Sequence, residues 1–477
     1  MGLFNNVKWV SISQITKIFS QVIGMFIFAR FLTPQQIGIM SMALVVVNFA
    51  NILRDLGSSA AIIQKEHVSE QLKNSVFYLN ALFGFLLFAL VFVFSSSIAE
   101  FFKEPDLALI LKCIAISFPI NSMTSVHLAL LERDSKFNKI AFVEVLSSVT
   151  SLLIAIYLST QGAGVYSLVA QTLLYSFLSA LGFWIFSSWF PGKHFSFNDI
   201  SSIFKFTSNL IGFNFINYFS RNCDQIIIGK FFSSSILGQY SLAYRIMLFP
   251  IQNITFVLTR SLYPLLSRLQ DSKAEAFKIY MSTIKLIAVI IPPLMLGLSS
   301  VSHDFVLFFF GEKWSSVAAI LILLAPTAIL QAMVSTTGSV FMSQGKTNVL
   351  LMISIFNAVL QIGSFIIGSF FDIHTLIKLY LVANIFMFIP NMFLAIKMLN
   401  GSFYYFVKSI YKPIFCAILM YVMVQLLSAK IGVLGLSLIS KLIVEILFGA
   451  LMYVILLSIV EWSFVSKKVM AKFAKNK

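Results

Sequence analysis

Long runs of apolar residues, separated by short polar segments, repeat along the whole chain of 477 residues. A helix needs about 20 mostly apolar residues to cross the hydrocarbon core of a bilayer, and lipid offers no hydrogen-bond partner to irregular backbone. The pattern therefore predicts an all-α, polytopic membrane protein with about 14 transmembrane helices. The predicted spans are residues 9–32, 37–60, 75–97, 107–130, 138–159, 165–189, 202–228, 237–262, 277–301, 316–340, 347–370, 375–397, 410–429 and 435–460.

The segments between these spans are short, the longest being residues 263–276 and 302–315. They leave no room for a soluble domain. The composition agrees, because 59% of the residues are hydrophobic and only 11% are charged, whereas soluble domains average about 25% charged residues.

The basic residues give the chain a net charge of +16. Of the 34 Lys and Arg, 21 fall near span ends on one predicted side of the membrane, 8 on the other side and five inside spans. Cytoplasmic loops of membrane proteins carry the excess of Lys and Arg. We therefore expect both termini to be cytoplasmic. The net positive charge thus reflects the orientation of the protein in the membrane. It is no sign of nucleic-acid binding, and we expect no nucleic-acid partner.

Two stretches of the chain align without a gap at an offset of 200. Residues 29–43 match residues 229–243, with Arg30 over Lys230, Phe31 over Phe231 and Gly38 over Gly238. A second match, Lys136 and Asn138 with Lys346 and Asn348, has an offset of 210. Because transporters are commonly built from internal repeats, we predict an N-lobe of six spans at 1–200, a C-lobe of six spans at 201–400, and two extra spans with a basic cytoplasmic tail at 401–477. Chance similarity between amphiphilic turns is the alternative.

Ionisable side chains inside the spans gather in the first helix pair of each lobe. An ionisable residue at the middle of a span costs about 2.5–3.5 kcal/mol on insertion scales, so it normally faces a bundle interior or a watery cavity. Four basic residues outnumber two acidic ones here, and they predict a cationic central cavity that binds an anionic group such as a pyrophosphate. The basic residues are Lys17, Arg54, Arg221 and Arg245, and the acidic ones are Asp55 and Asp224.

Other readings of these charges stay open. Arg221 and Asp224 are three residues apart and can neutralise each other as a structural pair. Asp55, Glu144 and Asp224 are candidates for an ion-coupling site, and Glu144 shares its side of a span with several serines. Lys285 can extend toward the cytoplasm, and Glu445 can pair with Lys441 one turn earlier.

Signals for catalysis, metals and nucleotides are absent from the sequence. The three cysteines are far apart, and no two of the five histidines have the spacing of a zinc site. Gly345-Lys346-Thr347 ends like a phosphate-binding loop, but Val340 stands where that motif needs glycine. We therefore expect a transporter, not an enzyme, with no metal and no cofactor.

Eight motifs together resemble the polysaccharide-transporter branch of the multidrug/oligosaccharidyl-lipid/polysaccharide exporter superfamily, and within it the Wzx-like lipopolysaccharide and colanic-acid-type exporters. The resemblance covers roughly residues 1–350. The motifs are Ala-Arg-Phe-Leu-Thr-Pro-x-x-Ile-Gly at 29–38, Asp-Leu-Gly-Ser-Ser-Ala-Ala-Ile-Ile-Gln at 55–64, Leu-Glu-Arg-Asp-Ser-Lys-Phe at 131–137, Gly-Ala-Gly-Val-Tyr-Ser-Leu-Val at 162–169, Asp-Gln-Ile-Ile-Ile-Gly at 224–229, Leu-Gly-Gln-Tyr-Ser-Leu-Ala-Tyr-Arg at 237–245, Tyr-Pro at 263–264 and Phe-Gly-Glu-Lys-Trp at 310–314.

The resemblance implies a flippase of the bacterial inner membrane. Its substrate would be an undecaprenyl-pyrophosphate-linked oligosaccharide repeat unit for O-antigen, capsule or exopolysaccharide synthesis. Transport would proceed by alternating access around the cationic cavity. Membrane lipid, a polysaccharide polymerase and a chain-length regulator are the other partners that it implies.

Two alternatives compete with this hypothesis. A cation-coupled drug antiporter of the same superfamily would share the fold, with Glu144 or Asp224 as its ion site, but it should present net negative faces. A membrane polysaccharide polymerase would need catalytic residues on a sizeable outer loop. The largest outer loop, 302–315, offers only His303, Asp304, Glu312 and Lys313.

Overall fold

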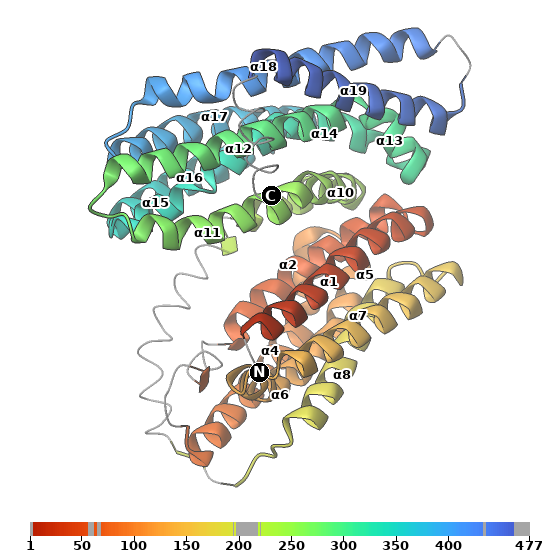
Figure 1. Cartoon of the computed structure of the whole chain (residues 1–477). Helices are drawn as coiled ribbons and strands as arrows, with labels where there is room; N and C mark the ends of the chain where they lie inside the picture. Colours follow the sequence, from red (N-terminus) through yellow and green to blue (C-terminus); the bar gives the residue numbers. More distant parts are fainter. Residues whose placement is uncertain are drawn as a thin grey trace. The chain divides into compact units, whose positions relative to one another are not determined.

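The computed structural model describes residues 3–55, 62–63, 68–193, 195–196, 218–219, 221–432 and 436–461. These residues are almost entirely helical and contain no strand, which confirms the all-α class. The chain divides into two compact units, Met1–Gly238 and Gln239–Lys477. Figure 1 shows their helices in sequence colours. The predicted lobe boundary between residues 200 and 201 lies outside the described residues, so the predicted lobe limits stay a prediction.

The first unit is a bundle of long helices. Within it α1 packs on α7, α7 on α8, α6 on α8, and α4 on both α5 and α6. A further helical stretch at 221–231 leads into the first turn of α10. The helices of this unit are α1 (Leu3–Phe31), α2 (Pro34–Asp55), α4 (Glu70–Phe102), α5 (Asp106–Ala115), α6 (Ser117–Arg133), α7 (Phe137–Thr160) and α8 (Tyr166–Ser187).

The second unit is built around α12 and α14. Here α12 packs on α14 and α18, α14 on α17, α16 on α17, and α18 on α19. Its elements, with α10 shared between the units, are α10 (Ser234–Pro250), η1 (Ile251–Thr255), α11 (Phe256–Ser267), α12 (Lys273–Ser300), α13 (Ser302–Phe309), η2 (Glu312–Trp314), α14 (Ser315–Val334), α15 (Thr337–Ser343), α16 (Thr347–Gly368), α17 (Ile373–Met398), α18 (Phe403–Ile431) and α19 (Leu438–Val460).

Twelve helical segments among the described residues are long and apolar enough to cross a membrane. They confirm a polytopic membrane protein. The helix α2 fills most of the predicted span 37–60 but is not among the twelve, and most of the predicted span 202–228 lies outside the described residues. The number 14 therefore stays a prediction.

Proline explains where two long segments change their helical form. The predicted span 107–130 breaks at Ile116, between α5 and α6. This is three residues before Pro119, which has no N–H to continue the hydrogen-bond ladder. The predicted span 237–262 contains a π-helical turn, η1, directly after Pro250. The predicted outer loop 302–315 is mostly helical, since α13 and η2 occupy most of it.

The distribution of side chains is that of a protein in lipid. Large apolar residues cover the outer faces, among them Leu82, Phe85 and Phe94, each about half exposed or more. Small polar residues lie inside, such as Ser95 and Ser122, which are fully buried. Small residues at helix contacts allow close packing where lipid tails remove the hydrophobic drive between helices.

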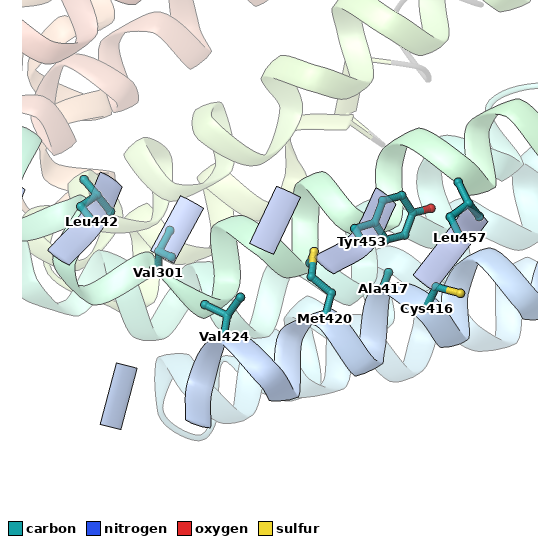
Figure 2. Close-up of a cluster of buried hydrophobic side chains, with 8 residues drawn as sticks. All are labelled: Val301, Cys416, Ala417, Met420, Val424, Leu442, Tyr453 and Leu457. Carbon is teal, nitrogen blue, oxygen red and sulfur yellow. The ribbon is translucent and has the colours of Figure 1, made fainter. Parts of the chain in front are cut away.

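The last two helices pack as a pair along α12. A cluster of buried side chains joins α18 and α19, with Cys416, Met420 and Val424 from the first helix and Tyr453 and Leu457 from the second (Figure 2). The Tyr453 hydroxyl donates a hydrogen bond to the Val289 carbonyl of α12 at 2.8 Å. The two C-terminal helices are therefore an integral part of the second unit.

A close backbone crossing joins the two stretches that align at an offset of 200. A Cβ added to Gly38 would lie 1.8 Å from the Ser234 carbonyl oxygen, and a Cβ added to Gly238 would lie 1.9 Å from the Pro34 carbonyl oxygen. Adding 200 to the number of Gly38 and subtracting 200 from that of Ser234 turns the first contact into the second. All four residues lie in the first unit. This reciprocal contact supports the internal repeat predicted from the sequence.

Candidate functional site

An ion pair joins α1 to α7 inside the first unit. The Lys17 Nζ lies 2.7 Å from Oε1 of Glu144. The Ser13 hydroxyl donates a hydrogen bond to the second oxygen, Oε2, of the same carboxylate. Ser13 and Lys17 are one helical turn apart and so share the face of α1 that meets α7. The sequence predicted Lys17 as a basic residue of a cavity, and the structure supplies its acidic partner.

The ion pair borders a cavity of about 220 Å³. Gln14 from α1, Glu132 from the end of α6 and Phe137 from the start of α7 also line it. The Lys17 side chain is 35% exposed and the Glu144 side chain 20% exposed. Both charged groups can therefore be reached from the cavity, and the pair is not sealed within the bundle.

The chemistry of this cavity follows from its charges. An ammonium and a carboxylate neutralise each other, and Glu132 adds a second carboxyl to the lining. A proton or a small cation on Glu144 would free the Lys17 ammonium, whereas an external anion could replace the Glu144 carboxylate beside it. The site can therefore exchange one partner of the ion pair for a ligand of the same charge. Sequence reasoning placed Lys17 among the substrate-binding residues and Glu144 among the ion-coupling residues, and it missed their contact.

Arg54 and Asp55, the predicted basic and acidic residues of span 2, stand at the last two positions of α2. Their side chains lie outside the described part of the structure, so their roles stay predictions.

Arg221 and Asp224 lie in the same helical stretch but in different surroundings. Arg221 is exposed, whereas Asp224 is only 1% exposed. The nearby Tyr218 donates its hydroxyl hydrogen to the Val45 carbonyl of α2, and its ring lies 5.8 Å from the ring of Phe49. Tyr218, three residues before Arg221, is thus held against α2, while Arg221 itself is exposed.

Arg245 lies on α10, in the second unit, and is exposed. The neighbouring Tyr240 and Tyr244 rings stack at 5.6 Å on the same helix. Among the predicted site residues whose side chains the structure describes, Lys17 and Glu144 form an ion pair.

Sequence reasoning missed two further ion pairs of the second unit. Lys285 of α12 contacts Glu461 at the end of α19, with 2.6 Å between Nζ and Oε2. Lys441 of α19 contacts Asp304 of α13, with 2.8 Å between Nζ and Oδ2. In each case the lysine inside a span could have indicated the ion pair, because a charged side chain within the membrane normally has a partner of opposite charge. Within the described residues no group of three or more His, Cys, Asp or Glu could hold a metal ion.

Helices that cross a membrane in two units, together with ionisable groups inside them, define a multi-pass membrane transporter. The chain belongs to the family described as polysaccharide biosynthesis protein, which matches residues 27–319. This agrees with the resemblance read from the eight motifs.

Curated relatives match nearly the whole chain. The teichuronic acid biosynthesis protein TuaB of Bacillus subtilis is 27% identical over 95% of this chain and 95% of its own length. The lipopolysaccharide biosynthesis protein WzxC of Escherichia coli is 26% identical over 86% of this chain and 84% of its own. The succinoglycan biosynthesis transport protein ExoT of Rhizobium meliloti is 24% identical over 96% of this chain and 93% of its own length.

Solved structures show the same fold. The lipid II flippase MurJ in an inward closed conformation has a TM-score of 0.77 at 17% identity, covering 95% of this chain and 99% of its own. An inward-facing multidrug resistance transporter of the MATE family has a TM-score of 0.60 at 14% identity. The match covers 83% of this chain and 98% of the transporter's chain.

Proposed function

We propose that this chain is a flippase of the bacterial inner membrane, with both termini cytoplasmic. It moves undecaprenyl-pyrophosphate-linked oligosaccharide repeat units from the cytoplasmic to the periplasmic leaflet for surface polysaccharide synthesis. Family membership supports this, as do relatives named for lipopolysaccharide, teichuronic acid and succinoglycan biosynthesis. A polysaccharide polymerase and a chain-length regulator act next on the product.

The observation that carries the proposal is the Lys17–Glu144 ion pair beside an open cavity. A pyrophosphate presents several charged oxygens, and an ammonium binds such oxygens through charge-assisted hydrogen bonds. The substrate headgroup therefore competes with the Glu144 carboxylate for Lys17. In the absence of substrate the carboxylate keeps the lysine charge neutralised inside the membrane, where an unpaired charge is costly.

A proton on Glu144 couples the site to an ion gradient. When the carboxylate takes up a proton, the ion pair is lost and the Lys17 ammonium is available to the headgroup. Because binding of the proton favours binding of the anion, binding of the anion must favour binding of the proton to the same extent. Arg54, Arg221 and Arg245 supply further positive charge to the headgroup along its path, and Asp55 and Asp224 are the alternative ion-coupling residues. Alternating access follows from the two-lobe architecture of such transporters.

The first experiment measures surface polymer in cells whose own flippase is replaced by the variant. Lys17→Ala should lower the polymer about 10-fold or more, because a hydrogen bond to a charged group contributes about 1.5–3 kcal/mol. Lys8→Ala is the matched control, since it removes the same charge from an exposed position on the same helix. Protein level in the membrane is measured in parallel. Normal polymer from Lys17→Ala would overturn the role of Lys17.

A second experiment separates binding from structure. Inorganic pyrophosphate should raise the melting temperature of the purified wild type, and Lys17→Ala should abolish that rise. Glu144→Gln removes the competitor and should increase the pyrophosphate effect. A purely structural ion pair predicts instead that both variants lose stability and that neither changes the pyrophosphate response.

The same variants test the drug antiporter. That function predicts normal polymer in every variant and a loss of drug resistance in Glu144→Gln. Either result would move the function to the other branch of the superfamily.

A further inference from the structure

Three charged side chains meet in the second unit, at the end where α12 and α18 terminate and α19 begins. Asp304 comes from α13, and Lys441 and Glu445 come from successive turns of α19. Lys441 Nζ lies 2.8 Å from Asp304 Oδ2 but 3.9 Å from Glu445 Oε1. The lysine is thus engaged mainly by Asp304. The expectation that Glu445 simply pairs with Lys441 describes only the weaker of the two contacts.

Glu445 is almost completely enclosed. The residue is 1% exposed, and neither of its carboxyl oxygens has a hydrogen-bond partner. It lies seven residues into α19, about 10 Å along the helix axis from Leu438 at 1.5 Å per residue. The groups that face it are Asp304 of α13, Lys441 of α19 and the Ser428 hydroxyl of α18. Lys441 Nζ, at 3.9 Å, is too far away to donate a hydrogen bond, and the Ser428 hydroxyl is the neighbouring donor.

The charges of this cluster do not balance when all three groups are ionised. Two carboxylates and one ammonium leave a net charge of −1 in a buried place. Proteins avoid a buried charge without hydrogen bonds by neutralising the group. A bound proton makes the Glu445 carboxyl neutral and the whole cluster electrically neutral, and it removes the repulsion between the two acids.

We propose that Asp304, Lys441 and Glu445 form a proton-binding site in the second unit, with Glu445 as the carboxyl that takes up the proton. The site stands apart from the Lys17–Glu144 pair and does not rest on the transport function proposed above. Because its members come from α13 and α19, with Ser428 of α18 beside them, the proton is linked to the packing of α19 against these two helices. The ligand is a proton and not a metal cation, since a cation would add positive charge beside the Lys441 ammonium and would find few oxygen ligands.

Infrared spectroscopy of the full-length protein in lipid nanodiscs tests the proposal, because it distinguishes a protonated carboxyl from a carboxylate. At neutral pH the wild type should show a protonated carboxyl band. Glu445→Gln should remove that band while preserving the shape of the side chain. Glu312→Gln is the matched control, since it removes an exposed carboxylate shortly after α13 and should leave the band unchanged.

A second variant keeps the test decisive even where Glu445→Gln fails to fold. Asp304→Asn releases Lys441 from its nearer partner, so that the ammonium can pair with Glu445 and displace the proton. The band should then disappear at the same pH with Glu445 still present. A band that survives both substitutions, or a wild type without any such band, would overturn the proposal. Loss of the wild-type band when sodium replaces choline in the buffer would also overturn it, in favour of a sodium site.

Discussion

The crossing of Gly38 with Gly238 provides a sharp quantitative test of the fold. In Gly38→Ala the new methyl carbon would lie 1.8 Å from the Ser234 carbonyl oxygen, whereas ordinary contact begins at 3.4 Å. The difference, 3.4 minus 1.8, requires the two backbones to separate by about 1.6 Å. The obstructing atom belongs to the backbone, so no side chain can rotate away.

The expected cost lies at the upper end of the range for overpacking, about 3 kcal/mol. For a unit of this size we expect a fall in melting temperature of roughly 6–12 °C, from about 2–4 °C per kcal/mol. The assay is thermal unfolding of the purified protein in detergent. Gly238→Ala should show the same loss, because its methyl carbon would meet the Pro34 carbonyl oxygen at 1.9 Å.

The control is Gly363→Ala in α16, where an added Cβ meets nothing within 4 Å. Alanine favours a helix over glycine by about 1 kcal/mol, so this variant should be as stable as the wild type or more stable. If Gly38→Ala melts with the wild type, the close crossing and the symmetry argued from it are wrong.

Three further predictions concern single contacts. Lys285→Met should destabilise the protein by roughly 2 kcal/mol or more, because it leaves the buried Glu461 carboxylate without its ammonium partner. The double variant Lys285→Met/Glu461→Gln should recover part of this loss in a melting experiment. Met420→Ala should cost about 2–3 kcal/mol through the cavity that it leaves in the α18–α19 cluster, while Phe415→Ala, at a position 55% exposed, should cost much less. Asp372 caps α17, and hydrogen bonds from the Thr375 hydroxyl and from the backbone N–H groups of His374 and Thr375 lower its pKa from 3.8. The contribution of Asp372 to stability should therefore be present above pH 3.8 and be lost as the pH falls through its lowered pKa. Hydrogen exchange in the first turn of α17 measures this loss. Asp372→Asn should keep the cap and lose the pH dependence.

The charged residues show where sequence reasoning succeeds and where it stops. The spacing of Ser13 and Lys17 on one helix face was readable, because neighbours one turn apart always share a face. The contact with Glu144 was not readable, since Ser13 and Glu144 are 131 residues apart and belong to different helices. Glu445 shows the same limit. Its expected pairing with Lys441 one turn away is present at 3.9 Å, but Asp304 from another helix holds the lysine more closely, at 2.8 Å.

The sequence by itself determined that the protein is a membrane protein, that it is all-α and that it belongs to its family, and it predicted the internal repeat. These properties follow from composition, from apolar run length and from local motifs, which act within single helices or along the chain. Only the tertiary structure decided which charges meet, how closely Gly38 and Gly238 approach, and which carboxyl is left buried without a hydrogen bond. Such contacts depend on the rotation and depth of each helix relative to its neighbours. That arrangement is set by the packing of all side chains in a unit together, and no short stretch of sequence contains it.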